Sequence, residues 1–396
     1  MKCVSNNISI IKKKCTGCGA CADICKNKAI TYSANEEGFI YPSIDTLNCV
    51  NCGACLRVCH TQNIINSTTH KQVSLMAITR DAILYKNAAS GGIWGTLSKA
   101  FLELYDNSFV CGASYSEGRV RHKLVSKSDY SSISRLQNSK YVQSDTIGVF
   151  KQIENYLEDG MFLLFSGTPC QVSGLHSFLK KDYDNLYTID LICHGVPSPS
   201  FFKKDIDSYG IIPKRVDFRW KNALLPQSAY FLCFSSRENP SIHPVFGRKI
   251  ISSNSDPYFS LFLRGASFRE CCYDCQYAGL NRVGDITIGD CDSSSMFPSF
   301  HPKMSKSTVI LNTRKGHDLW QQFNSLFDYQ EIDIEIESKK NRQLCQSSER
   351  PSIRDAVYVD LNHLSSEEFR IKYGRRDSWF KGFIFKILDV LPFRLR

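Results

Sequence analysis

The sequence lacks any long uninterrupted run of apolar residues. No segment of the 396 residues approaches the length of about 20 that a membrane-spanning helix needs. The first ten residues, MKCVSNNISI, also lack an apolar core of the length found in secretory signal peptides. We therefore expect a cytoplasmic protein, in which the thiols stay reduced.

The sequence also lacks a nucleic-acid-binding signature. No helix-turn-helix or RNA-binding motif accompanies the formal net charge of +10, which comes from 49 basic and 39 acidic side chains. The excess charge is either a solvated basic surface or an attraction for an acidic partner. Lys12, Lys13 and Lys14 stand directly before the first cysteine run, where a small ferredoxin-like electron carrier would dock.

Cysteine, by contrast, is abundant, with eighteen residues. Residues 15–25 and 49–59 repeat the pattern C-x-x-C-x-x-C-x-x-x-C. This spacing is typical of bacterial two-cluster ferredoxins, in which the fourth cysteine of each run ligates the cluster of the other run. The pattern therefore assigns one 4Fe-4S cluster to Cys15, Cys18, Cys21 and Cys59, and a second to Cys49, Cys52, Cys55 and Cys25.

One alternative to iron stays open at this point. Paired C-x-x-C units also bind zinc, so a zinc-stabilised interaction protein is conceivable, although two complete copies of the longer pattern favour iron–sulfur clusters. Lys26 and His60 stand where two-cluster ferredoxins usually carry proline. The sequence therefore departs from the two-cluster ferredoxin pattern next to the fourth ligand of each run, but all eight ligands are present.

After a polar linker at 66–71, strand and helix patterns alternate. Buried strands are expected at 73–79, 161–165, 186–192 and 285–290. The second and third of these strands are followed by Cys170 and Cys193, at the edge where parallel sheets bind ligands. Together with the Cys272-x-x-Cys275 unit they supply the four thiolates of one more cluster. A lone buried cysteine is more often a small apolar residue, so spacing alone leaves both possibilities open.

A second ligand signal is Ser90-Gly91-Gly92, which precedes a predicted helix. Free amides and the helix dipole at such a start suit a phosphate, although a plain turn has the same composition. Further on, Lys140 and Tyr141 offer a charge and a stacking ring to a cofactor, or are ordinary surface residues.

Residues from about 75 to 335 resemble the beta-subunit family of coenzyme F(420) hydrogenases and dehydrogenases. The resemblance is carried by SGG at 90–92, NSKYVQ at 138–143, GTPCQ at 167–171, CHGVP at 193–197, and RECCYDC with GDITIGD between 269 and 290. It implies FAD beside a 4Fe-4S cluster. The implied cluster ligands are Cys170, Cys193, Cys272 and Cys275, and Cys271 could replace its neighbour Cys272. The implied flavin contacts lie near Ser90, Gly91, Gly92, Asn138, Lys140, Tyr141, Gln143, Thr168, Pro169 and Gln171.

The resemblance does not determine the substrate. Members of the family act on a deazaflavin coenzyme or on chlorophyll-type pigments, or deliver electrons to larger reductases. This sequence has the motif CHGVPSP at 193–199. Relatives that share this motif resemble family members found with bacterial surface-polysaccharide genes. His194 is a candidate proton donor near the flavin, because histidine titrates near neutrality; a hydrogen-bonded structural histidine is the alternative.

We therefore predict an α+β two-cluster ferredoxin-like domain over 1–66, an α/β domain with a mixed, largely parallel sheet over 72–335, and a helical extension over 336–396. The predicted function is that of an iron–sulfur flavoprotein oxidoreductase. It passes electrons between a ferredoxin-like carrier, three 4Fe-4S clusters and FAD, and reduces or oxidises a small organic substrate or a deazaflavin-type coenzyme. The alternative is a non-catalytic subunit that delivers electrons to a partner enzyme. The apolar, basic tail at 379–396 suggests contact with a membrane surface or a partner chain, or a helix packed on the body.

Overall fold

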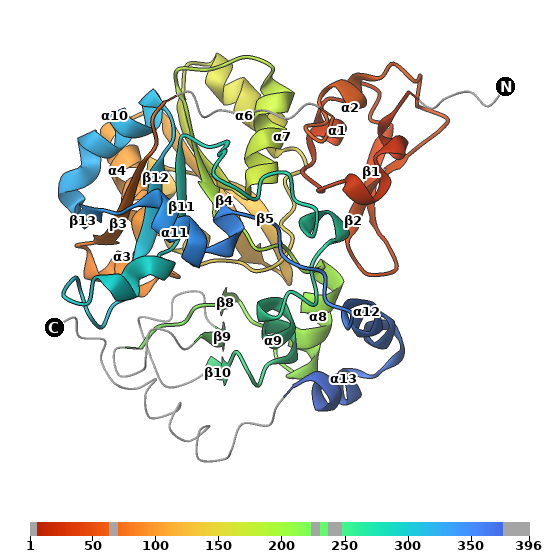
Figure 1. The fold of residues 1–396 in the computed structure, drawn as a ribbon. Coiled ribbons are helices and arrows are strands. Elements are labelled where there is room, and N and C mark those ends of the chain that lie inside the picture. The colour runs from red at the N-terminus through yellow and green to blue at the C-terminus, as the bar shows by residue number, and fades with distance from the viewer. Residues whose placement is uncertain (1–5, 63–69, 223–229, 237–247, 375–396) are drawn as a thin grey trace.

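The computed structural model describes residues 6–62, 70–222, 230–236 and 248–374 (Figure 1). The predicted tail at 379–396 and most of the predicted linker at 66–71 lie outside these residues. Within the part of the chain that is described, no helix is both long and apolar enough to cross a membrane.

The N-terminal module is a small α+β unit built around the two cysteine runs. A two-stranded antiparallel sheet, β1 (Ile30–Ala34) and β2 (Ile40–Ile44), separates the runs. The short helices α1 (Ala20–Asp23) and α2 (Ala54–Arg57) lie within the runs, so that each helix carries the third cysteine of its run. The core of the module contains little besides Ile8, Ile11 and cysteines, as expected of a fold in which bound clusters replace apolar side chains.

The central element of the chain is an eight-stranded mixed sheet with the order β13-β3-β12-β11-β7-β6-β4-β5. Its inner strands β4, β6, β7 and β11 are parallel, and the remaining pairs are antiparallel. The strands are β3 (Val73–Thr79), β4 (Ser108–Ser116), β5 (Arg119–Ser126), β6 (Phe162–Gly167), β7 (Leu186–Leu191), β11 (Ile286–Asp290), β12 (Ser307–Leu311) and β13 (Phe327–Glu331). The predicted fold class is confirmed, and four of these strands match the predicted ones; the β4–β5 hairpin, β12 and β13 were not predicted.

Helices cover both faces of this sheet, giving three layers (Figure 1). One face packs against α4 (Ile93–Leu104), α5 (Ile133–Leu136) and α10 (Arg314–Phe323). The other face packs against α6 (Val149–Glu158) and α7 (Pro169–Leu179), and this apolar core continues into the N-terminal module through Ala20 and Val58.

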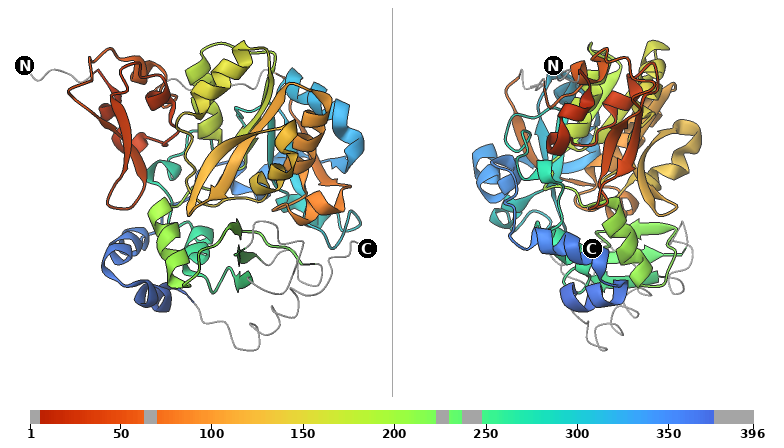
Figure 2. Two further views of the ribbon diagram at one scale, coloured as in Figure 1. Left: turned by 180° about the vertical axis from the view of Figure 1, so that it is seen from behind. Right: turned by 90° about the vertical axis from the view of Figure 1, so that its right-hand side faces the viewer.

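A second core lies below the sheet, and the module lies beside the sheet at α7 (Figures 1 and 2). The second core joins α8 (Pro199–Ser208), α9 (Pro257–Leu263), α12 (Arg354–His363) and α13 (Ser366–Tyr373) to a three-stranded sheet of β8 (Arg215–Asp217), β9 (Phe231–Ser235) and β10 (Arg248–Ser252). Its packing is mainly aromatic, and Phe39 from the β1–β2 turn is fully buried in it.

One buried ion pair fixes the module to this second core. Arg354, at the start of α12, has no solvent-exposed side-chain surface and donates two hydrogen bonds to the carboxylate of Glu37, at 2.7 and 2.8 Å. Its Nε donates to the carbonyl oxygen of Phe268 at 2.9 Å. Parallel N–H···O bonds of this kind hold both position and angle, so the turn of the hairpin is held rigidly against α12.

We predict that Arg354→Met lowers the free energy of unfolding by about 3 kcal/mol, because it leaves the Glu37 carboxylate without its buried partner. The measurement is an anaerobic thermal melt of wild type and variant. Arg314→Met is the control: its pair with Asp318 is on the surface, with side chains 78% and 59% exposed, so its loss is expected to cost less than about 1 kcal/mol. Equal melting temperatures for the two variants would contradict the prediction.

Candidate functional site

The parallel strands β6, β7 and β11 end at the same edge of the sheet, and a cavity of about 1220 Å³ opens there. Thr168 and Cys170 follow β6, Cys193 and His194 follow β7, and Asp290 ends β11; all five line the cavity. The loops that follow parallel strands can converge on a ligand because their chain directions agree, so this edge is the natural binding site of the sheet.

Late cysteines gather at one end of the cavity, and we call Cys170, Cys193, Cys271 and Cys275 the third cysteine set. Burial raises the pKa values of Cys170 and Cys193 to about 12, and the neighbouring thiols add to the shift: Cys275 acts on both, and Cys271 acts on Cys170. Cys271 likewise raises the pKa of Cys275. Cys272, the ligand that the resemblance implies, also lines the cavity, but it packs against the second core. The structure therefore groups Cys271 more closely with Cys170 and Cys275.

Burial and mutual repulsion make free thiolates unfavourable in this set. Four closely spaced sulfurs in a low-dielectric site suit a cationic iron–sulfur core, because metal coordination removes the thiol protons and balances the charge. The donors present therefore fit a 4Fe-4S cluster.

The first three cysteines of the first run and the last cysteine of the second run form an inner cysteine set: Cys15, Cys18, Cys21 and Cys59. Burial raises the pKa of Cys18 well above its usual range, and the three other thiols of the set raise it further, so the four lie together. The ligand grouping expected of a two-cluster ferredoxin thus brings in Cys59 from the second run.

The inner set packs directly on α7. A Cβ atom on Gly174 would lie only 2.8 Å from the sulfur of Cys18, so only glycine allows this approach. The hydroxyl of Thr146 also donates to the carbonyl oxygen of Cys18, at 2.7 Å. Because Cys170 stands in the first turn of the same helix, α7 joins the inner set to the third set.

Two further contacts bridge these sets. The thiol of Cys271 donates to the carbonyl oxygen of Cys15 at 3.4 Å. His60, which replaces the usual proline, is fully buried and lies 2.9 Å from the Thr16 hydroxyl and 2.5 Å from the Tyr277 hydroxyl. Burial lowers the pKa of His60 to about 4, so the imidazole is neutral at physiological pH. The substitution at position 60 therefore supplies a hydrogen bond between the module and the body.

The remaining four cysteines of the module, Cys25, Cys49, Cys52 and Cys55, form the outer cysteine set. Cys52 is exposed, Cys25 and Cys49 are partly exposed and Cys55 is buried, so this set lies closer to solvent than the inner set does. Leu47 and Val50, beside Cys49, are 94% and 69% exposed.

The flavin contacts implied by the sequence fall mainly on the same cavity. All of them line it except Gly91, whose amide donates to the Ser307 hydroxyl at 2.9 Å. The start of α4 is the part best suited to an anion: Gly92 caps it with a φ of +87°, and no side chain caps the helix. Trp94 in its first turn lines the cavity, and its buried Nε1–H has no hydrogen-bond partner in the described residues. These orphan donors fit a diphosphate-bearing cofactor.

Lys140, one of the flavin contacts that the resemblance implies, hydrogen-bonds the protein backbone. Lys140 is buried, and its ammonium donates to the carbonyl oxygens of Arg135, Gln137 and Asn138 at 2.9, 2.5 and 3.0 Å. Burial lowers its pKa to about 7. Lys140 therefore holds the 135–138 turn at the cavity wall instead of extending a free charge into it.

The polar groups of Gln171 and Thr168 also form hydrogen bonds within the protein. The Gln171 side-chain oxygen accepts from the Thr168 amide at 3.0 Å in the capping box of α7, and its Nε2 donates to the Ser144 hydroxyl at 2.8 Å. Unlike α4, α7 therefore does not offer a free helix start.

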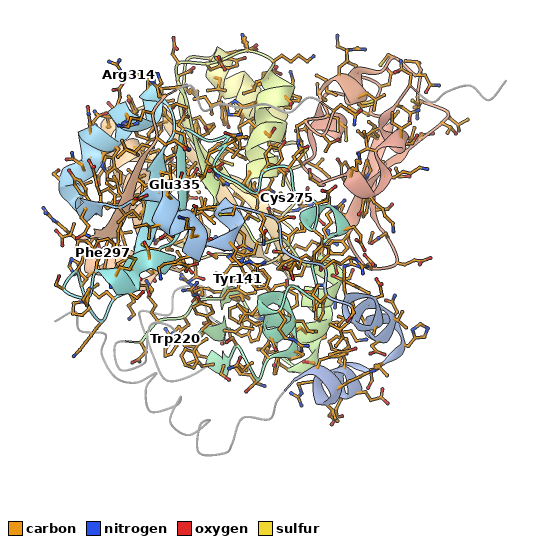
Figure 3. All side chains as sticks on the ribbon, viewed as in Figure 1. Tyr141, Trp220, Cys275, Phe297, Arg314 and Glu335 are labelled. Atoms are coloured by element: carbon orange, nitrogen blue, oxygen red, sulfur yellow. The ribbon has the colours of Figure 1, made fainter. Side chains whose placement is uncertain are left out.

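The cavity wall beside the 138–143 segment contains an ion pair that the sequence reasoning missed, in which the Arg219 side chain is buried and that of Asp290 is 36% exposed. Arg219 donates to the Asp290 carboxylate at 2.7 Å, and its guanidinium lies 3.7 Å from the centre of the Tyr230 ring. His194 lines the cavity nearby, and burial lowers its pKa, so it is neutral at pH 7. Its imidazole makes no hydrogen bond within the described residues. Figure 3 labels Tyr141, which lies on this side, and Cys275, which lies toward the module.

Comparison with known proteins agrees with both halves of this site. Residues 14–63 match the model of the 4Fe-4S dicluster domain. A search of curated proteins finds no match. Among solved structures, a chain of the F420-reducing [NiFe] hydrogenase complex from Methanosarcina barkeri is 16% identical, with a TM-score of 0.46 over 78% of this chain and 96% of that chain. Residues 160–335, which supply the third cysteine set, match the family described as the C terminus of the coenzyme F420 hydrogenase/dehydrogenase beta subunit.

Proposed function

We propose that the protein is an iron–sulfur flavoprotein oxidoreductase that moves electrons between a carrier protein and an organic substrate. The observation that carries this proposal is the position of the third cysteine set. It lines the same cavity as the cradle at the start of α4, and the Cys271 sulfur lies only 3.4 Å from the carbonyl oxygen of Cys15 in the inner set. An electron path from the module to a flavin therefore needs no rearrangement of the chain.

The positions of the three cysteine sets suggest the order in which electrons would pass through them. The outer set lies closer to solvent than the inner set, which is packed on α7, and the third set lies at the cavity. When bound, 4Fe-4S clusters transfer single electrons, and FAD joins one-electron and two-electron chemistry. The protein holds the centres close together and keeps solvent away from the inner and third sets.

An acidic carrier is expected to dock at the outer set. Lys26 and Lys28 are exposed there, and the Asn27 amide donates to the Asn48 carbonyl oxygen at 3.3 Å, which places them beside exposed Leu47 and Val50. A charged rim around a small apolar centre suits a transient redox complex. Lys12, Lys13 and Lys14, expected from the sequence to dock the carrier, are exposed, and Lys13 and Lys14 also line the cavity, where the Lys13 charge helps to lower the pKa of Glu270.

The flavin would occupy the cradle formed by Ser90, Gly92 and Trp94 together with residues 138–143. The free amides at the start of α4 bind its diphosphate, and the Trp94 indole donates one further hydrogen bond. Lys140 shapes this wall by tying together the carbonyl groups of the 135–138 turn.

The substrate would bind beside His194 and the Arg219–Asp290 pair, next to the 138–143 segment, since Arg219 donates to the Tyr141 hydroxyl at 3.3 Å. His194 is accessible from the cavity and is positioned to exchange a proton there, and the Arg219–Asp290 pair with Tyr230 forms a rigid polar and aromatic surface. The first substrates to examine are a deazaflavin coenzyme, as the family resemblance implies, and sugar derivatives, as the CHGVPSP motif at 193–199 suggests.

The function is tested on anaerobically purified, reconstituted protein. We expect visible absorbance, acid-labile sulfide, iron for three clusters and bound FAD, with flavin reduction when a reduced ferredoxin is added. Zinc without sulfide would reject the proposal. Turnover of an organic acceptor by the isolated chain supports an enzyme, whereas electron uptake with turnover only in the presence of a second chain supports an electron-transfer subunit.

We predict that Cys193→Ala removes about four of about twelve irons, because it deletes one ligand of the third cluster only. Iron and sulfide analysis measures the loss, and exposed Cys345→Ala is the control, with full iron expected. The pair Cys271→Ala and Cys272→Ala identifies the remaining ligand, since only the ligand variant should lose iron. Full iron in Cys193→Ala would refute this ligand set.

Lys140→Ala is predicted to lower the amount of FAD that copurifies, because the carbonyl groups of the 135–138 turn lose their common donor and the cavity wall relaxes. The FAD-to-protein ratio after acid release is the measurement. Lys127→Ala, which changes a surface pair with Asp106, is the matched control and should retain FAD. Equal flavin contents for the two variants would count against this wall as the flavin site.

The double variant Lys26→Glu/Lys28→Glu is predicted to weaken binding of an acidic two-cluster bacterial ferredoxin about tenfold at low salt, because two attractive charges become repulsive. Calorimetric titration of the complete chain gives the Kd, and added salt should shrink the difference between variant and wild type. Lys180→Glu/Lys181→Glu, at the far end of α7, is the control for net charge. If the control weakens binding as much as the test variant does, the docking face lies elsewhere.

A further inference from the structure

Arg269 is completely buried where the inner set, the third set and the flavin cradle meet. Its Nε donates to the carbonyl oxygen of Cys15 at 2.7 Å. Its Nη1 donates to the carbonyl oxygen of Ile40 and to the side-chain oxygen of Gln143, both at 3.0 Å. One guanidinium thus touches the first cysteine run, the β1–β2 hairpin and the cavity wall.

The charge of Arg269 has no carboxylate partner within the described ranges. The ionisable groups nearest its charge are the thiols of Cys15 and Cys271, the Tyr41 hydroxyl and Cys272, and burial raises the pKa values of Cys15, Cys271 and Tyr41, so that these groups are neutral. Its Nη2 is buried and has no hydrogen-bond partner in the described part of the chain. A buried guanidinium without a counter-ion is strongly unfavourable, so an anion is expected at this place.

Arg282 provides the contrast. It is also buried near the third set, but its Nη2 lies 3.3 Å from the buried carboxylate of Asp190. The charge of Arg282 is therefore balanced by the protein itself, whereas that of Arg269 is not. The Tyr41 ring, whose centre lies 3.8 Å from the Arg269 guanidinium, stabilises the cation without neutralising it.

We propose that the clusters held by the inner and third sets are the counter-ions of Arg269, and that this one guanidinium raises the reduction potentials of both. The inference rests on the proposed function, because it requires a cluster at each set. A cluster gains one negative charge when it takes up one electron. A fixed positive charge in a medium of low dielectric constant therefore favours the reduced form of each cluster.

Sharing one charge has a consequence for electron flow. A group that acts on two clusters shifts their potentials in the same direction, so it changes the driving force of the step between them less than it changes either potential. None of the strongest electrostatic partners of Arg269 belongs to the outer set, which lies closer to solvent and is screened more strongly. The outer cluster is therefore expected to keep its potential when Arg269 is changed, and serves as an internal reference.

The experiment is a potentiometric titration of the complete, reconstituted chain, followed by electron paramagnetic resonance so that the three clusters are measured separately. Arg269→Met removes the charge at similar length and is expected to move the inner and third clusters to more negative potentials while the outer cluster stays unchanged. Arg269→Lys keeps a charge but loses the fork of donors, so a smaller shift in the same direction is expected. Arg57→Met is the matched control, since Arg57 donates to the Cys52 carbonyl oxygen at 2.9 Å and should affect only the outer cluster.

The outcomes separate this inference from the proposed function. Fewer than three clusters in the wild-type protein would overturn the function itself. Three clusters in the wild type with unchanged potentials in both Arg269 variants would overturn only the role of Arg269. Where Arg269→Met loses its clusters on folding, the neutral, polar Arg269→Gln decides: a negative shift of both inner and third clusters supports the inference, and unchanged potentials reject it.

Discussion

Electron transfer between protein-bound centres slows steeply with distance, so the packing of the N-terminal module against α7 is the contact on which the rest of the structure depends. Gly174 lets the sulfur of Cys18 approach the helix, and Thr146 holds the adjacent carbonyl. Asp23 of α1 adds a third contact, because its carboxylate accepts from the amides of Gly148 and Phe150 at the start of α6, at 2.7 and 3.0 Å. A carboxylate in that position also interacts favourably with the helix dipole. The module is thereby held at α6 and α7 as well as at α12.

The same packing creates an electrostatic problem that bound clusters would resolve. It buries thiols of the inner and third sets and places Arg269 among them without a carboxylate. Each of these groups is unfavourable when buried alone, since charges removed from water need partners. An anionic cluster on each side of Arg269 satisfies both requirements, which is why the guanidinium and the cysteines are best understood as one unit.

Different groups of residues line different parts of the cavity at the sheet edge. The third cysteine set lies beside the module, and the uncapped start of α4 and the Arg219–Asp290 pair line the remainder, with Arg219 donating to the Tyr141 hydroxyl at 3.3 Å. Parallel strand order explains the convergence, because β6, β7 and β11 all release their following loops at this edge. The third cysteine set, His194 and Asp290 therefore line one cavity.

The sequence by itself determined the two clusters of the module and the α/β class with a mixed, largely parallel sheet, because ligand spacing and apolar periodicity are local properties. Helices α4 and α7 could likewise be recognised from their apolar spacing. Tertiary structure alone decided which thiols gather: Cys271 and Cys272 are indistinguishable in the sequence, yet the short turn at 270–272 directs Cys271 toward Cys15 and Cys275. It also decided the roles of Arg269, Arg219 and the Glu37–Arg354 pair, whose partners lie between about 70 and more than 300 residues away in the chain. Such partners are chosen by the packing of distant segments, and no local pattern records that choice.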